Sequence, residues 1–236
     1  MDDCVMYNTI KNQSDAQQLQ DDLNTLSMWQ DLWQMSFNAD KCFVLRLTHA
    51  KTPKQHQYTL GNKILQNTSS HSYLGVEITS DLKWGNHIQS KVAKANRALG
   101  FIRRNLYSCP KDLKATAYQT LVRPHLEYSS TIWDPHTQDL KDQLEKIQRR
   151  AVRFVCNDFR RTSSVTAMLN ALQWDTLETR RKAARLSMFH KIHHGQTAIP
   201  AGKFLQPVTR LSRHNHSESY KLKTSNKDCH KFSFFP

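Results

Sequence analysis

The chain has 236 residues, long enough for one large domain or two small ones with a buried core. Its ordinary aromatic content and its six glycines exclude a collagen-like or generically disordered protein. A mean hydropathy of -0.68 and the lack of an apolar run of eighteen or more residues argue against a membrane span. The N-terminus does not read as a secretory signal, because no basic stretch precedes an apolar one.

The charge is divided unevenly along the chain. Residues 1–83 hold seven Lys and Arg against nine Asp and Glu, whereas residues 84–236 hold twenty-seven against eleven. The whole positive excess therefore lies in the later part, which favours a polyanionic partner there. The alternative is a solvated basic surface that has no partner.

The five cysteines are odd in number and widely spaced, without a C-x-x-C pair. This pattern is typical of a reducing compartment and provides no metal framework. We expect an intracellular protein, either cytoplasmic or nuclear.

The first eighty residues predict a mixed region of helix and strand. Strands are expected at residues 4–10, 41–47, 57–60 and 73–78, separated by polar turns. Between the first two strands, the segment from Ser14 to Gln17 predicts a capping box that opens a helix. The apolar stripe of this helix consists of Leu19, Leu23, Leu26, Trp29 and Trp33.

From Trp84 onward the apolar periodicity is helical. A first stripe runs from Ile88 to Ile102, and a second helix with Leu113, Ala117 and Leu121 is expected to be interrupted at Pro124. The next helices are predicted as follows: a long one with a stripe from Leu140 to Val155, one at residues 165–172, and one at residues 177–194 closed by Gly195 as a C-cap. Residues 196–236 lose the periodicity, turn polar and predict a flexible tail.

Arginine clusters accompany the amphipathic helices. Guanidinium groups bind phosphates in bidentate geometry, so a bundle with such faces could follow a nucleic-acid backbone without reading its sequence. The alternative is that these are ordinary solvated helix faces. The clusters are Arg103-Arg104, Arg149-Arg150 with Arg153, Arg160-Arg161, and Arg180-Arg181-Lys182 with Arg185.

An acidic pair, Asp2-Asp3, precedes the first expected strand. Phosphoryl transfer with two metal ions uses carboxylates that hold both cations, and two neighbouring Asp residues can supply part of such a site. They cannot supply all of it, because successive side chains of a strand point to opposite faces. Surface acidity is the alternative. A metal site at His190 and His194 is not expected, because a third ligand is lacking.

Read in order, several segments resemble the C-terminal half of reverse transcriptases from non-LTR (LINE-type, jockey-like) retrotransposons. The resemblance covers roughly residues 1–195. It is carried by Asp2-Asp3-Cys4-Val5-Met6-Tyr7, Asn38-x-x-Lys41-Cys42, Tyr73-Leu74-Gly75-Val76, Leu121-Val122-Arg123-Pro124, Trp133-Asp134-Pro135 and Gln148-Arg149-Arg150-Ala151.

The resemblance implies an α+β fold in three parts. Residues 1–83 would be a partial palm with a small β-sheet and a helix, residues 84–195 a helical thumb and C-terminal connection, and residues 196–236 the flexible polar tail. The partners implied are RNA or an RNA/DNA duplex, bound through its backbone, with dNTP as the substrate of the parent enzyme.

The resemblance also assigns roles to individual residues. Asp2 and Asp3 match the catalytic, metal-binding pair for Mg²⁺, and Lys41 matches a catalytic lysine that lies near the incoming nucleotide and assists the departure of pyrophosphate. Tyr73, Leu74 and Gly75 match the primer grip. The nucleic-acid contacts expected from the thumb are Arg103, Arg104, Arg149, Arg150 and Arg153.

The fingers and the first half of the palm have no counterpart in this sequence. We therefore expect a reverse transcriptase fragment that does not polymerise alone and retains template–primer binding in its basic helical part. The alternatives are a non-catalytic nucleic-acid-binding module and a non-functional remnant of a mobile element.

Overall fold

The computed structural model describes residues 4–48, 50, 52, 55–208, 216, 219–221 and 224–235. Its internal contacts divide the chain into two compact units, Met1–Trp84 and Gly85–Pro236. Small sheets with one long helix form the first unit and helices dominate the second, so the fold is α+β as predicted. None of the helices in the described ranges is long and apolar enough to cross a membrane.

The first unit begins with helix α1, Gln13–Leu32. Its N-cap is Asn12, whose side chain accepts from the Asp15 N–H at 2.9 Å, while the Asp15 carboxylate accepts from the Asn12 N–H at 3.0 Å. The capping box is therefore real, but it lies two residues before the expected Ser14 and Gln17. An Asn with an acidic residue three positions later satisfies the same orphan N–H groups as the expected pair.

Three two-stranded sheets follow in the described part of this unit. Strand β1, Phe43–Leu45, pairs in parallel with β4, Gln66–Thr68. Strand β2, Thr59–Leu60, turns at Gly61 and pairs antiparallel with β3, Lys63–Ile64. Strand β5, Ser70–Tyr73, forms a hairpin with β6, Val76–Thr79.

Two strand predictions in this unit are wrong. Residues 4–10 have no regular secondary structure and pair with no strand among the described residues, and Tyr7 is 88% exposed. Alternation predicts a strand only where a neighbouring strand completes the hydrogen-bond ladder. Residues 73–78 are not one strand, because the chain reverses within them at Leu74 and Gly75. The strand expected at 41–47 shortens to 43–45 and follows a 3₁₀ turn, η1, Ala39–Lys41.

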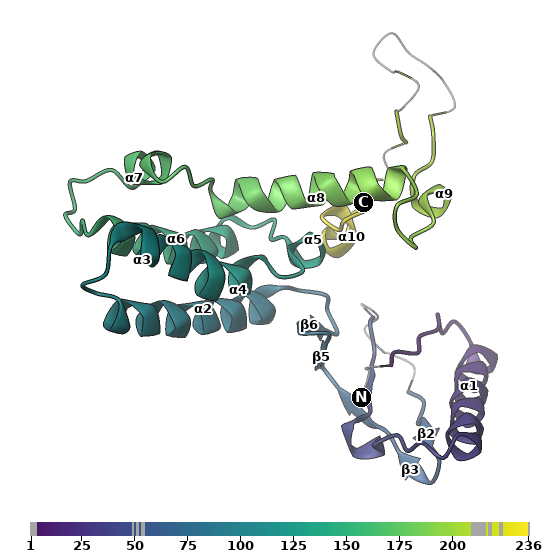
Figure 1. The fold of residues 1–236 in the computed structure, drawn as a ribbon. Helices are drawn as coiled ribbons and strands as arrows, with labels where there is room; N and C mark the ends of the chain where they lie inside the picture. Colours follow the sequence, from purple (N-terminus) through teal and green to yellow (C-terminus); the bar gives the residue numbers. More distant parts are fainter. Residues whose placement is uncertain are drawn as a thin grey trace. The chain divides into compact units, whose positions relative to one another are not determined.

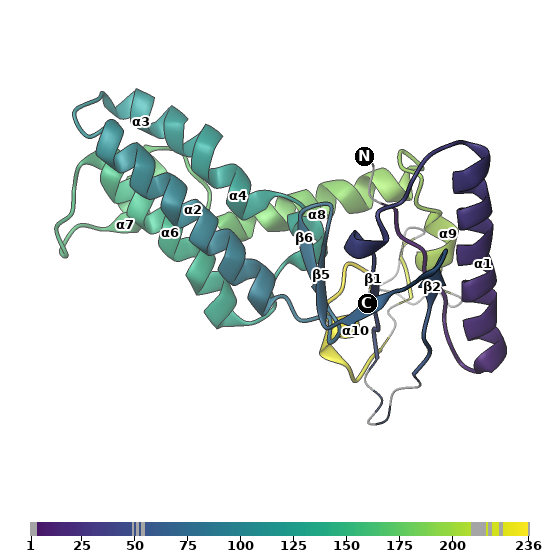
Figure 2. The same ribbon diagram turned by 90° about the horizontal axis from the view of Figure 1, so that it is seen from below.

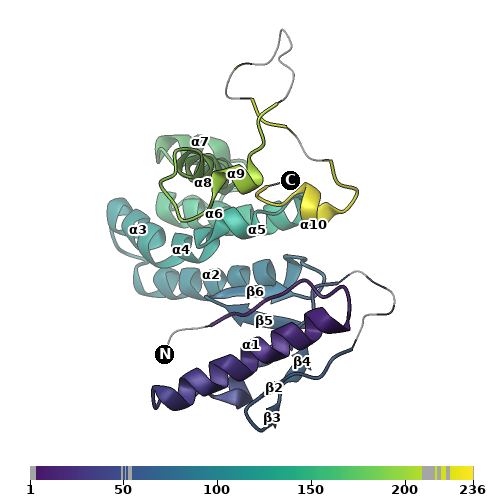
Figure 3. The ribbon, with the colours of Figure 1, turned by 90° about the vertical axis from the view of Figure 1, so that its right-hand side faces the viewer.

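The core of the first unit is small. Ala16, Tyr58, Leu60 and Leu65 are buried, and the half-buried leucines of α1 pack against them. Helix α1 lies beside β2 (Figure 3). The tryptophans at the end of the expected stripe stay outside this core: Trp29 is 41% exposed and Trp33 is 63% exposed.

In the second unit, helices α2, Gly85–Asn105, and α6, Gln138–Cys156, lie side by side (Figures 1 and 2). The stripes predicted for both helices are confirmed. The buried members, all at 2% exposure or less, are Ile88, Ala95, Leu99, Ile102, Leu144, Ile147, Ala151, Phe154 and Val155. These residues form the centre of the helical core.

The helix around Pro124 differs from the prediction. Helix α3, Lys111–Ala117, runs into a π-helical turn, Tyr118–Val122, and then directly into α4, Arg123–Glu127. The chain thus stays helical through Pro124, which cannot donate an N–H to the preceding turn, and the irregularity takes the form of the π-helical turn just before it. The widened turn lies before it, with the Arg123 N–H donating to the Tyr118 carbonyl.

Only part of the stripe predicted for this segment is buried. Ala117 is buried as expected, but Leu113 and Leu121 are about half exposed, and the other buried positions are Lys114, Tyr118, Val122 and Leu126. Lys114 is buried because its ammonium lies 5.1 Å from the Phe154 ring centroid and 5.8 Å from that of Tyr107. Aromatic rings stabilise a cation at such distances.

The remaining helices of this unit are α5, Ser130–Trp133, α7, Val165–Ala171, α8, Leu177–His193, α9, Ala201–Phe204, and α10, Asp228–Lys231. Gly195 follows α8 with a φ of 66°, a left-handed conformation that ends the helix as expected. The assignment of residues 196–236 to a flexible tail stays a prediction. Part of this segment packs on the helical unit, since Phe232 stacks on His136 at 4.2 Å and Arg185 donates to the Ser233 carbonyl at 2.9 Å.

Candidate nucleic-acid interface

The acidic pair Asp2-Asp3 lies outside the described residues. Among the described ones, no three His, Cys, Asp or Glu side chains come together as metal ligands. The assignment of Mg²⁺ to Asp2 and Asp3 therefore stays a prediction that comes from the resemblance.

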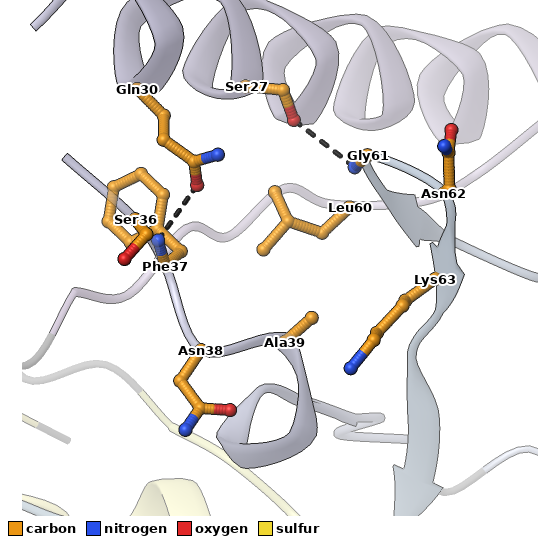
Figure 4. Close-up of a pocket in the computed structure, with 10 residues that line it drawn as sticks. All are labelled: Ser27, Gln30, Ser36, Phe37, Asn38, Ala39, Leu60, Gly61, Asn62 and Lys63. Atoms are coloured by element: carbon orange, nitrogen blue, oxygen red, sulfur yellow. Dashed lines mark hydrogen bonds between the residues drawn. The ribbon is translucent and has the colours of Figure 1, made fainter. Parts of the chain in front are cut away.

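The motif of Asn38 and Lys41 forms the short turn η1. The Asn38 side chain accepts from the Asp40 N–H at 3.1 Å and so caps the turn, which leaves Lys41 exposed at its end. Beside it lies a hollow of about 600 Å³ between the end of α1, η1 and the β2–β3 turn (Figure 4). Two hydrogen bonds fix its walls, from the Phe37 N–H to Gln30 Oε1 at 2.8 Å and from the Gly61 N–H to Ser27 Oγ at 3.2 Å.

The residues expected in the primer grip meet at the tip of the β5–β6 hairpin. Tyr73 pairs with Val76, so Leu74 and Gly75 form a two-residue turn. Their φ angles are 46° and 76°, which fits a type I′ turn, the geometry that follows the twist of the strands. Leu74 is 55% exposed at this tip. The hairpin itself is observed, and its contact with a primer stays a prediction.

The long helices α2 and α6 of the second unit expose several Lys and Arg side chains. Helix α2 contains five Lys and Arg and no Asp or Glu. The positive charges of α2 lie close to one another: the pKa of Lys91 is lowered by burial and, to a smaller extent, by the neighbouring Lys94. We call the α2–α6 basic face the following exposed residues: Arg97, Arg103 and Arg104 of α2, and Lys146, Arg149 and Arg150 of α6.

One hydrogen bond connects the two helices on this face. Arg150 Nη1 donates to Asn96 Oδ1 at 3.1 Å. Asn96 and Arg103 are seven residues apart, so they share one side of α2 at a separation of about 10 Å. The guanidinium groups of Arg150 and Arg103 therefore follow one another along the α2–α6 contact.

Arg153 has a different role from its neighbours on α6. Its guanidinium donates to the backbone carbonyls of Asp158, Arg160 and Ser163 at 3.4, 2.7 and 3.3 Å. These bonds fix the loop that follows α6. Whether Arg153 also contacts nucleic acid stays a prediction.

The arginine cluster on α8 is used inside the protein, contrary to expectation. Arg181 is fully buried and donates to Asp134, Arg185 lies 3.6 Å from the same carboxylate, and Arg180 forms a bidentate pair with Glu127. A run of basic residues in the sequence predicts positive charge but does not say which way each side chain points. In this cluster, three of the four side chains point to acidic partners. Lys182 is the member of the cluster that stays exposed.

The sequence reasoning missed two residues of this surface. Asn96 carries no charge, and the only signal for it is its spacing of seven from Arg103. Phe159 directly precedes Arg160-Arg161 and is 50% exposed, with the Arg103 guanidinium 5.9 Å from its ring centroid. An aromatic residue next to an arginine pair was the signal that could have found it.

Comparison with known proteins identifies two relatives. Over 224 residues, 90% of this chain, it is 25% identical to a protein described as "Probable RNA-directed DNA polymerase from transposon BS" of Drosophila melanogaster. Over 142 residues, 57% of this chain, it is 27% identical to the "RNA-directed DNA polymerase from mobile element jockey" of Drosophila funebris. The matches span 24% and 15% of these relatives.

No protein-family model and no solved structure matches the chain significantly. The two relatives agree with the motifs quoted above, both in the kind of polymerase and in the kind of mobile element. The chain is therefore a relative of the RNA-directed DNA polymerases of jockey-like non-LTR retrotransposons, and it spans about a quarter of their length or less.

Proposed function

We propose that this chain supplies the end of the palm and the thumb of an RNA-directed DNA polymerase, and that its helical unit binds the template–primer through the α2–α6 basic face. The observation that carries the proposal is the row of guanidinium groups along two packed helices, one of which has no acidic residue. The relatives' printed activity requires an RNA template, which is a polyanion of the kind this face would bind.

The chemistry of the face favours the backbone over the bases. Arg103 and Arg150 are exposed on rigid helices, and the bond to Asn96 restricts where the Arg150 guanidinium can lie. Guanidinium groups bind phosphate oxygens in fixed geometry, and such contacts orient a duplex without specifying its sequence. This is what a polymerase that copies any template requires.

The roles proposed for the first unit come from the resemblance. Asp2 and Asp3 would hold Mg²⁺, Lys41 would lie near the incoming dNTP, and Tyr73, Leu74 and Gly75 would contact the primer end. The exposed position of Lys41 and the exposed hairpin tip are compatible with these roles.

The test is binding of a fluorescein-labelled RNA/DNA heteroduplex to the full chain, followed by fluorescence anisotropy at several salt concentrations. Each phosphate contact contributes about 0.9 to the slope of log K against log salt on a duplex. We expect Arg103→Ala and Arg150→Ala each to weaken binding equally for two unrelated sequences and to reduce the slope by about that amount.

Lys182→Ala is the matched control, because this residue is exposed and basic but lies on α8 outside the face. It should leave the affinity and the slope nearly unchanged. Equal losses for Lys182→Ala and Arg150→Ala would show that only the net charge matters, and the proposed face would then be wrong.

A further inference from the structure

The loop after α6 is held in one shape by the protein itself. Residues 157–163, which we call the 157–163 loop, begin with Asn157 in the left-handed conformation at a φ of 50°. The Asp158 N–H donates to the Arg153 carbonyl at 3.0 Å, and the Arg153 guanidinium binds three carbonyls of the loop. One arginine of α6 thus spans the whole loop from the helix side.

A second set of bonds fixes the outer side of the loop. The Asp158 carboxylate accepts from the Arg160 N–H at 3.1 Å and from Arg160 Nε and Nη2 at 3.1 and 3.0 Å. The hydrogen bonds from the Arg160 side chain, and one from Ser163, hold the pKa of this carboxyl well below its usual range. The same bonds that favour the charged carboxylate hold the Arg160 side chain against the loop.

The fixed loop displays a large apolar ring to solvent. Phe159 is 50% exposed, and Arg161 beside it is exposed as well. The Arg103 guanidinium lies over the Phe159 ring at 5.9 Å from its centroid, a cation–π contact that fixes the ring relative to α2. An immobilised aromatic ring loses little conformational entropy when it binds a flat partner.

We propose that Phe159 is a stacking platform for an unpaired base of single-stranded nucleic acid, with Arg103 and Arg161 binding the adjacent phosphates. Every base has a π face, so stacking on an aromatic side chain tolerates any sequence, and a positive surface beside the ring attracts the backbone. Both components are present at the 157–163 loop, where one ring lies among arginines.

The proposal rests on the proposed function of the α2–α6 basic face and extends it to a second form of nucleic acid. Arg103 belongs both to that face and to the platform, because it shares one side of α2 with Asn96, the partner of Arg150. The platform thus lies at the end of the basic face. A strand that leaves the bound duplex could continue onto Phe159.

The test compares two kinds of probe on the full chain. Fluorescein-labelled 12-mers of deoxythymidine and of uridine serve as the single strands, and their two results distinguish DNA from RNA. A blunt RNA/DNA heteroduplex serves as the paired probe. Phe159→Ala should weaken single-strand binding about tenfold, the effect of losing roughly one stacked base, and change heteroduplex binding less than about twofold.

Salt dependence separates the ring from the charges. Phe159→Ala should leave the salt slope unchanged, whereas Arg161→Ala should lower the slope for single strands by about 0.7. Phe159→Trp should retain the affinity for single strands, since a larger ring stacks at least as well. Circular dichroism of each variant checks that the helices are intact.

Phe101→Ala is the matched control. Phe101 is 56% exposed on α2, close to the value for Phe159, but it lies about 200° around the helix from Arg103. Equal losses for Phe101→Ala and Phe159→Ala, or an unchanged single-strand affinity for Phe159→Ala, would overturn the platform. Equal losses on the paired and single-stranded probes would overturn it as well.

Failure of the platform and failure of the proposed function give different results. If Arg150→Ala leaves heteroduplex binding intact while Phe159→Ala still weakens single-strand binding, the α2–α6 basic face is wrong and the platform is supported. If Arg150→Ala weakens heteroduplex binding and Phe159→Ala changes neither probe, the platform alone is wrong.

Discussion

Arg181 of α8 and Asp134, the residue that follows α5, form a salt bridge within the helical unit, with Arg181 Nε 2.8 Å from Asp134 Oδ1. The arginine side chain is fully buried, and Arg185 approaches the other carboxylate oxygen at 3.6 Å. Asp134 follows Trp133, which is also buried and donates from its indole to the Tyr128 carbonyl at 2.8 Å. The Trp-Asp-Pro segment is therefore fixed to α8 by the salt bridge and to the end of α4 by the indole hydrogen bond.

Removing the Asp134 carboxylate alone should lower the free energy of unfolding more than removing both Asp134 and Arg181. Asp134→Ala leaves the Arg181 charge buried without its partner and should lower the free energy of unfolding by about 3–5 kcal/mol. The double variant Asp134→Ala/Arg181→Met removes that charge and should be more stable than Asp134→Ala alone. Urea unfolding of the full chain, followed by circular dichroism, measures both.

The control for this pair is Lys141→Ala, which breaks the more exposed bridge from Lys141 to Glu178. Exposed pairs contribute about 1 kcal/mol or less, so this variant should unfold close to the wild type. If the loss in free energy of unfolding for Asp134→Ala/Arg181→Met equalled the sum of the losses for Asp134→Ala and Arg181→Met, the buried-charge explanation would be contradicted.

His87 should make the helical unit sensitive to acid. Burial, with smaller contributions from Lys91 and Lys94, lowers the pKa of His87 to about 4. The unfolded chain binds a proton near pH 6.5 and the folded chain does not, so stability is complete above pH 6.5 and falls as the pH decreases toward 4. The shift corresponds to roughly 3 kcal/mol over this window.

His87→Phe removes the titrating group and keeps a planar ring beside Trp133, whose ring centroid lies 5.4 Å from that of His87. The variant should lose stability less steeply than the wild type between pH 6.5 and 4. Urea midpoints at half-unit pH steps test this, and identical pH profiles would contradict the assignment.

Periodicity predicted the parts of the fold that are governed by one apolar stripe. The stripes of α2 and α6 are buried as expected, because each helix packs one face on the common core. The segment around Pro124 was misread because Lys114, a charged residue, occupies a core position between two aromatic rings. No stripe analysis selects a lysine over Leu113 for the core.

The candidate site was predicted in part for the same reason. Charge indicated the arginines of α2 and α6, but the direction of each side chain depends on tertiary partners. Arg181 is buried and binds Asp134. Arg153 donates to the loop carbonyls, whereas Arg149, one turn earlier on α6, is exposed. The Arg181–Asp134 pair joins residues 47 positions apart, and the Arg153 contacts depend on the shape of the loop, so neither can be read from helical spacing.

Arg153 should control the order of the 157–163 loop. Arg153→Met keeps most of the side-chain volume and removes the donors to the carbonyls of Asp158, Arg160 and Ser163. Amide hydrogen exchange within this loop should then become faster, while exchange in the middle of α2 stays slow. Arg149→Met is the control, since it changes the same residue type on the exposed side of α6. Equal effects of the two variants would mean that Arg153 does not hold the loop.

At the turn of the β5–β6 hairpin, we expect one substitution to raise the stability of the first unit and to lower the affinity for the heteroduplex. Leu74 has a φ of 46°, a left-handed conformation that costs a leucine about 1 kcal/mol more than it costs an asparagine. Asn-Gly is the preferred pair for a type I′ turn. Leu74→Asn should therefore stabilise the first unit by up to about 1 kcal/mol, as measured by urea unfolding.

The same substitution should weaken binding if the exposed Leu74 side chain contacts the primer, as the resemblance implies. We expect Leu74→Asn to bind the heteroduplex several-fold more weakly although it is more stable, because an apolar contact at the hairpin tip is lost. Gln34→Asn provides the control: Gln34 is an exposed residue of the same unit with a φ of 53°, so it gains similar backbone relief away from the hairpin. Unchanged heteroduplex affinity in Leu74→Asn would leave the leucine without a role at this turn and would contradict its assignment to the primer grip.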